Sequence, residues 1–154
     1  MIKKIITLFL ILIPINSYAL IEVDITRGNL DPLPVAVSPL SIDEKSRKSF
    51  QKVLKKKNIG EEISSIVENN LSTSGLFNPL SKEAFLQDPD IANLKPRFED
   101  WNLIKAQALI TGQVNYVDDK LRVEFRLWDV LAAKEMMALA FTTVPTNWRR
   151  VGHI

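Results

Sequence analysis

The side chains that could perform acid–base chemistry in this chain are two adjacent pairs of acids and one histidine. Asp118 and Asp119 fall in a polar stretch typical of a hairpin turn, where carboxylates bond nearby backbone groups. Glu61 and Glu62 fall in the first turn of a predicted helix, where acidic side chains complement the helix dipole. The single histidine, His153, has no motif around it. We therefore predict that neither acidic pair is catalytic.

Nucleophilic and metal chemistry are not indicated either. The sequence contains no cysteine, which excludes disulfides, thiol nucleophiles and thiolate-bound metals. With one histidine as the remaining strong nitrogen ligand, a zinc site of the ordinary kind is not expected. The serines lie outside any nucleophile-elbow motif, and Gly112 stands alone in a predicted strand instead of a phosphate-binding loop. The sequence predicts a protein that is not an enzyme and carries no cofactor or metal.

The first nineteen residues have the pattern of a secretory signal peptide. Lys3-Lys4 forms the positive region, residues 5–15 are mostly apolar, and small residues at 17 and 19 precede a predicted cut between Ala19 and Leu20. The apolar stretch is shorter than the ~20 residues of a membrane-spanning helix. We therefore expect export and no stable membrane insertion after cleavage. An uncleaved N-terminal anchor is the alternative.

The positive charge of the chain resides largely in this leader. Removing its two lysines from the chain's 20 basic side chains leaves 18, equal to the 18 acidic ones. A protein that binds nucleic acid or an anionic membrane would keep an excess of positive charge. Neither partner is therefore predicted from the overall balance.

Two segments near the start of the exported chain have clear patterns. Apolar and polar residues alternate as in a half-buried strand, in the order Ile21, Glu22, Val23, Asp24, Ile25, Thr26. Val35–Val37 is a short apolar run between prolines, consistent with a buried strand.

Ser41 and Glu44 have the spacing of a capping box that would start a helix. This helix carries the lysine-rich stretch Lys45–Lys57, the chain's basic cluster. We interpret the cluster as a solvated helix face because no aromatic residue is interleaved with the lysines. A contact with an acidic partner is the alternative.

The middle of the chain predicts helices. Apolar residues at helical spacing between Ile59 and Leu71 indicate a helix that ends at Gly75, with Leu76 as the accompanying apolar contact. A short helical turn is expected over residues 81–85, loops at residues 88–90 and 95–96, and a brief helix around residues 98–104.

The last third of the chain predicts strands. Period-two alternation begins at Ala106 and resumes over residues 121–128 after the turn at 118–120. Met136–Val144 is apolar on both faces, which predicts a central strand covered on both sides. Thr146 is expected to cap a short final helix. Helices followed by an antiparallel meander predict an α+β fold, a two-layer sandwich whose mixed or antiparallel sheet carries two to three helices on one face.

Five segments together resemble the TolB amino-terminal domain family. TolB proteins are the periplasmic component of the Tol-Pal system. The five segments are Pro34–Val37, Glu62–Leu71 with Ser74–Leu80, Ala108–Val114, Arg126–Val130 and Asn147–Ile154. After the signal peptide predicted over 1–19, the resemblance implies a mature partner-binding segment over 20–34 and an α+β domain over 35–154 that ends within its last helix.

The resemblance also implies partners. In the family, the first mature residues bind the C-terminal domain of TolA, an inner-membrane protein, and Leu20–Asp31 is the counterpart here. The alternation in Ile21–Thr26 suits strand addition to a partner's sheet; a first strand of the domain's own sheet is the alternative. The family's Pal contact belongs to a β-propeller for which this chain shows no repeat, so Pal binding is not expected. The lysine-rich stretch is longer than the family's usual linker.

The function implied is that of a periplasmic adaptor acting in outer-membrane integrity and in constriction during cell division. A periplasmic regulatory domain that docks on a cell-wall synthase is the alternative, since the same α+β sandwich would serve it. An envelope hydrolase is disfavoured by the lack of paired acids, metal ligands or a triad in the sequence.

Overall fold

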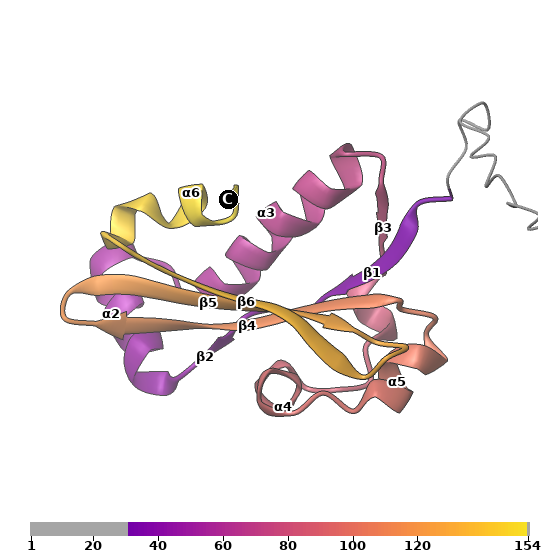
Figure 1. Cartoon of the computed structure of the whole chain (residues 1–154). Coiled ribbons are helices and arrows are strands. Elements are labelled where there is room, and N and C mark those ends of the chain that lie inside the picture. Colours follow the sequence, from indigo (N-terminus) through magenta and orange to yellow (C-terminus); the bar gives the residue numbers. More distant parts are fainter. Residues whose placement is uncertain (1–30, 154) are drawn as a thin grey trace, which may run out of the picture. The chain divides into compact units, whose positions relative to one another are not determined.

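A computed structural model describes residues 31–153 and shows one mixed β-sheet with helices packed on it (Figure 1). The predicted signal peptide, its cleavage site and the 21–26 strand lie outside the described residues. Five strands follow each other across the sheet in the order β3-β1-β4-β5-β6. A short strand, β2 (Ser41–Ile42), pairs with β4 beyond the end of β1. The prediction of an α+β fold with a mixed sheet is confirmed.

The parallel part of the sheet is built around β1 (Leu33–Val37). It lies between β3 (Phe77–Pro79) and β4 (Ala108–Val117), with Leu33 opposite Phe77 and Val35 opposite Ala108. Its last three side chains are buried. The apolar run between prolines is therefore a short buried strand, as predicted.

The antiparallel part is a meander of three ten-residue strands, β4, β5 (Lys120–Asp129) and β6 (Lys134–Thr143). Asp118 and Asp119 join β4 to β5 with φ values of 49° and 58°. Two consecutive left-handed residues are the signature of a type I′ hairpin turn. The prediction of a turn at these acids is confirmed.

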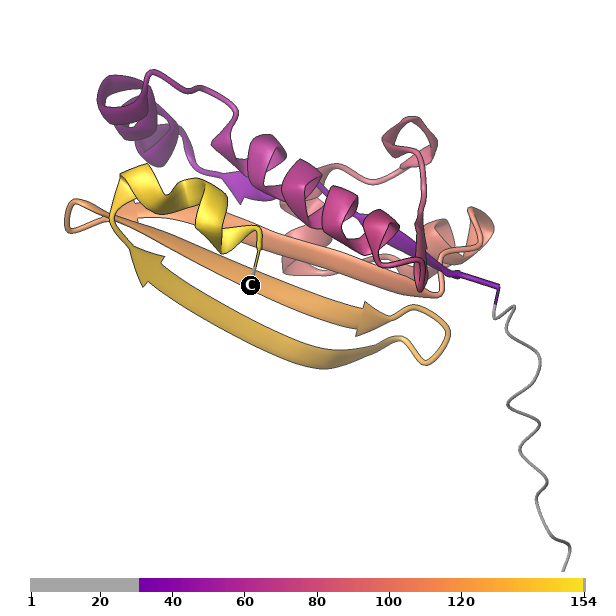
Figure 2. The same ribbon diagram turned by 90° about the horizontal axis from the view of Figure 1, so that it is seen from above.

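The prediction that Met136–Val144 forms a central strand was wrong. Among the described residues, β6 pairs with β5 and lies at the outer edge of the sheet (Figure 2). Most of its side chains are exposed, including Met136 at 63% and Leu139 at 46%. A run of apolar residues is a property of the local sequence. A central position in the sheet depends on whether a second strand pairs with the free side, and the run does not encode this.

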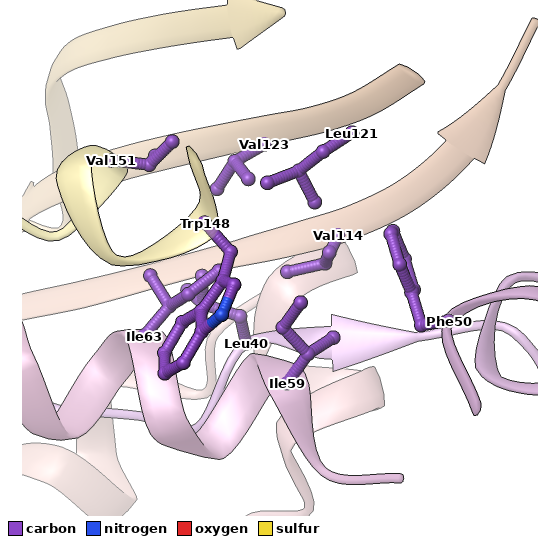
Figure 3. Close-up of a cluster of buried hydrophobic side chains, with 9 residues drawn as sticks. All are labelled: Leu40, Phe50, Ile59, Ile63, Val114, Leu121, Val123, Trp148 and Val151. Atoms are coloured by element: carbon purple, nitrogen blue, oxygen red, sulfur yellow. The ribbon is translucent and has the colours of Figure 1, made fainter. Parts of the chain in front are cut away.

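One face of the sheet carries three helices, α2 (Glu44–Leu54), α3 (Ile59–Thr73) and α6 (Trp148–Val151). Their apolar side chains meet those of β4 and β5 in the larger core cluster (Figure 3). This cluster consists of Leu40, Phe50, Ile59, Ile63, Val114, Leu121, Val123, Trp148 and Val151. The predicted helix starting near Ile59 is present, and these three helices match the predicted helical layer.

The opposite face is partly covered by α4 (Pro89–Leu94) and α5 (Phe98–Leu103), and Phe85, which follows η1 (Lys82–Ala84), packs against the same side. They enclose a second cluster in which Trp101 and Ala92 pack with Leu109 of β4. The sandwich thus gains a partial third layer. Asp88-Pro89-Asp90 was wrongly predicted as a loop: Asp88 caps α4 through Asp90 N at 2.9 Å, and Pro89 occupies its first turn.

Other predicted caps also differ from the structure. The N-cap of α2 is Asp43, which accepts from Ser46 N, while Ser41 belongs to β2. Thr146 lies in η2 (Pro145–Asn147) and makes no cap bond to α6. Gly75 does take the predicted left-handed conformation with φ 72°, whereas Leu76 after it is exposed.

Candidate functional site

An apolar groove of about 220 Å³ lies between α3, α6 and the outer strands of the sheet. Its walls are almost entirely hydrocarbon, and among the described residues that line it Arg126 alone is charged. The lining residues are Val67, Leu71, Ile110, Phe125, Arg126, Leu127, Met137, Leu139, Phe141 and Val151. A groove of this composition can accept apolar side chains, and it contains no group suited to bond making or breaking.

The groove follows from strand register. Leu127 pairs with Met137, Phe125 with Leu139, and Val123 with Phe141. Residues opposite each other in an antiparallel pair project to the same face, so the apolar rows of β5 and β6 lie side by side. The rings of Phe125 and Phe141 pack edge to face with centroids 6.2 Å apart. Helices α3 and α6 cover the inner part of this surface and leave the β6 row accessible.

The other side of the meander carries a polar network centred on Glu124. Arg122 Nε and Gln113 Nε2 donate to the two oxygens of its carboxylate at 2.9 and 2.8 Å. Burial raises the pKa of Glu124, but these bonds and the neighbouring arginines outweigh it and hold the pKa below its ordinary value. The carboxylate is therefore ionised and fully engaged. Its role is to pair neighbouring strands.

The reactive residue types considered from the sequence stay apart in space. Asp119 accepts from Tyr116 Oη at 3.1 Å in the hairpin turn, and Glu62 forms an ion pair with Lys56. His153 Nδ1 lies 3.1 Å from Asn70 Nδ2 at the end of α6. Within residues 31–153, no three His, Asp or Glu side chains are placed to hold a metal ion. Nor does any buried side-chain polar atom there lack a hydrogen-bond partner.

The predicted partner-binding residues Ile21, Glu22, Val23, Asp24, Ile25 and Thr26 lie outside the described residues, as do Ala19 and Leu20 at the predicted cleavage site. The structure therefore does not test the roles of these residues, which stay predictions. The groove was missed from the sequence because β6 was assigned to the sheet centre.

The family model of the TolB amino-terminal domain matches residues 21–136. The match covers most of the chain. This chain belongs to the TolB amino-terminal domain family. The resemblance noted from five sequence segments is thereby confirmed.

A full-length relative agrees with this assignment. The Tol-Pal system protein TolB of Pelagibacter ubique (strain HTCC1062) is 74% identical over all 154 residues. The chain covers 34% of that relative, so it spans about a third of its length.

Solved structures agree in fold. TolB from Acinetobacter baumannii superposes with a TM-score of 0.58 at 22% identity, over 79% of this chain and 26% of that one. A lipoprotein of Neisseria meningitidis gives a TM-score of 0.52 at 16% identity, over 73% of this chain and 81% of that one. At these identities the likeness concerns the α+β architecture alone. Over residues 31–153, no helix is long and apolar enough to cross a bilayer.

Proposed function

We propose that this chain acts in the periplasm as an adaptor module of the Tol-Pal system and contributes to envelope integrity through protein contacts. The main support for this proposal is that the chain belongs to the family and is 74% identical, over all of its own 154 residues, to a Tol-Pal system protein TolB. The leader-like residues 1–19 support delivery to the periplasm, with cleavage between Ala19 and Leu20.

The proposed role is non-enzymatic. Across the described residues, the titratable side chains are dispersed into turns, helix starts and strand-pairing networks. The accessible groove is lined by hydrocarbon. Both features suit a surface that binds other proteins.

The partner proposed for this chain is the C-terminal domain of a TolA-like inner-membrane protein, bound by Ile21–Thr26. Alternating side chains let such a segment join the edge of a partner's sheet, where backbone bonds supply affinity and one row of side chains supplies specificity. The apolar row is Ile21, Val23 and Ile25, and the polar row is Glu22, Asp24 and Thr26. Pal is not a proposed partner of these 154 residues.

The test is a calorimetric titration of the TolA C-terminal domain from the same organism into residues 20–154. Binding is expected for this mature chain and not after deletion of residues 20–31. Val23→Asp should abolish binding because it places a charge in the apolar row, whereas Glu22→Gln, on the opposite row, should leave most of the affinity.

Circular dichroism of every variant checks that the domain stays folded. Absence of binding by the folded mature chain would overturn the assignment of TolA as partner. Recovery of a cell-wall synthase and of no Tol component from periplasmic extract would overturn the Tol-Pal role itself.

A further inference from the structure

Helix α2 presents a row of lysines to solvent. Lys45, Lys48 and Lys52 follow each other at spacings of three and four residues, which places them on one side of the helix, and Lys55 is its C-cap. All four are exposed. The buried residues of α2, Ser46 and Phe50, lie on the opposite side and pack against the sheet. We call these four residues the lysine row.

Helix stability does not account for the lysine row. Cations are favourable near the C-terminus of a helix, where the last turn contains Lys52, and unfavourable near the N-terminus, where Lys45 and Lys48 lie. The one acidic residue of the helix, Glu44, is shared between Arg47 and Lys48 at 3.7 Å each, and its side chain is mostly exposed. Such pairs contribute little.

The charge of the chain is unevenly distributed. Residues 44–57 hold seven basic and one acidic side chain, a net charge of +6, which the rest of the chain after residue 19 balances with −6. A neutral total charge therefore conceals a strongly basic segment over residues 44–57. Helix α6 lies near α2 (Figure 1). Its Arg149 Cζ is 4.7 Å from the Trp148 ring centroid, and Lys56 Nζ is 4.8 Å from the same ring.

The side-chain types select the partner. A specific acidic protein site is usually met by arginine, whose guanidinium pairs with carboxylates in two-point contacts, and by aromatic anchors. The lysine row contains neither: Arg47 of the same helix is half-buried beside Glu44, and Arg149 of α6 stacks on the Trp148 ring. Lysine is a mobile point charge without a preferred geometry, which matches a fluid layer of anionic headgroups.

We propose that α2 is a peripheral membrane-binding face, which rests its lysine row on the anionic phospholipid headgroups of a bilayer. The apolar side of α2 is committed to the core, so the contact is electrostatic and does not insert the helix. This inference is independent of the Tol-Pal role. It refines the conclusion drawn from net charge alone, because a local row of cations is sufficient for surface attraction.

The test is co-sedimentation of residues 20–154 with phosphatidylethanolamine–phosphatidylglycerol vesicles and with neutral phosphatidylcholine vesicles. Binding is expected to the anionic vesicles only and to weaken as salt is raised. Each lysine near such a surface changes the partition coefficient about fivefold. The partition coefficient of the variant Lys45→Gln/Lys48→Gln/Lys52→Gln/Lys55→Gln should therefore fall by more than about a hundredfold.

The matched control is Lys95→Gln/Lys105→Gln/Lys120→Gln/Lys134→Gln, which removes the same charge from exposed positions outside α2. It should bind the anionic vesicles nearly as well as the unaltered chain. Equal losses in the two variants would mean that binding follows total charge, and no binding at low salt would mean that the row serves another acidic partner. Either result overturns the proposal. Thermal melts of both variants exclude unfolding as the cause.

Discussion

At the scale of single residues, position 112 requires glycine because strands β4 and β5 approach each other closely there. A Cβ on this residue would lie 2.1 Å from the backbone oxygen of Glu124 and 3.0 Å from Leu40 Cδ2. Neither the paired strand nor the buried Leu40 can move without loss of packing. We expect Gly112→Ala to lower the free energy of unfolding by about 3 kcal/mol, at the upper end for overpacked cores. Urea unfolding followed by tryptophan fluorescence measures this.

Gly75 provides the matched comparison. Apart from its two chain neighbours, no atom of residues 31–153 lies within 4 Å of a Cβ built at this position, but the backbone is left-handed with φ 72°. Asparagine tolerates this conformation better than other side chains. Gly75→Asn should therefore cost under about 1 kcal/mol. The close-approach explanation is wrong if Gly112→Ala proves no more destabilising than Gly75→Asn.

Asp43 joins the start of α2 to the sheet. Its Oδ1 accepts from Ser46 N at 2.8 Å and its Oδ2 from Ser46 Oγ at 2.7 Å. The same hydroxyl oxygen accepts from Tyr116 N at 2.8 Å, which connects the cap to β4. Removing this cap with Asp43→Ala should lower the free energy of unfolding by about 1 kcal/mol at neutral pH. Chemical unfolding of the two proteins gives the difference.

The same carboxylate predicts a pH dependence. The hydrogen bond from Ser46 N, followed by that from its hydroxyl, holds the pKa of Asp43 below its ordinary value. The folded state thus favours the ionised form. This stabilisation is complete above the ordinary aspartate pKa and disappears as pH falls through the lower folded-state pKa. The stability gap between the unaltered chain and Asp43→Ala should accordingly narrow in acid, and a gap that stays constant would contradict the prediction.

At the scale of elements, the edge position of β6 predicts unequal sensitivity in neighbouring strands. Val123 of β5 is fully buried, whereas Met136 of β6 is 63% exposed. Val123→Ala should cost about 2 kcal/mol because it leaves a cavity. Met136→Ala should stay within about 0.5 kcal/mol, as for most surface positions. A large cost at Met136 in urea unfolding would indicate that β6 is covered in solution.

Helix α6 predicts a local opening. It has four residues, and isolated helices of this length are unstable in water. Trp148 and Val151 are buried, and Asn70 Nδ2 donates to Gly152 O at 2.8 Å, so its order depends on tertiary contacts. Hydrogen exchange should show residues 147–153 opening well below the global free energy. Protection equal to that of β5 would contradict this expectation.

The elements also show how far the sequence alone could be followed. Strands β4 and β5 and their hairpin were predictable because alternation and a polar turn are local signals. The position of β6 was not, because an apolar strand looks the same at the centre or at the edge of a sheet. Helix α4 was missed because proline was interpreted as a breaker, although after Asp88 it starts a helix. The groove depends on register between strands and on helix placement, which no single segment encodes.

At the scale of the whole molecule, the fold presents two surfaces with different chemistry. The apolar groove forms where the β5 and β6 rows extend beyond the helices, and the lysine row lies on α2. The sequence-level charge balance gave no sign of the second surface because acidic residues elsewhere cancel it. Composition can limit the class of partner, but only the fold shows which residues share a face.

The residues that form the described core predict that residues 20–31 can be removed without unfolding the domain. Both core clusters are built from residues at or after Ala36, and β1 begins at Leu33. Deleting residues 20–31 should therefore keep cooperative unfolding and shift the melting temperature by less than about 4 °C, the effect of under 1 kcal/mol. Differential scanning calorimetry measures this.

Deleting residues 20–34 provides the contrast, because it also removes the pairing of Leu33 with Phe77 and the bond from Leu33 N to Leu76 O at 2.9 Å. This longer deletion should be clearly destabilising, since β1 joins β3 to the rest of the sheet. If deleting residues 20–31 already unfolds the domain, Ile21–Thr26 is a structural strand of this domain. It would then not be available as a free segment for a partner's sheet.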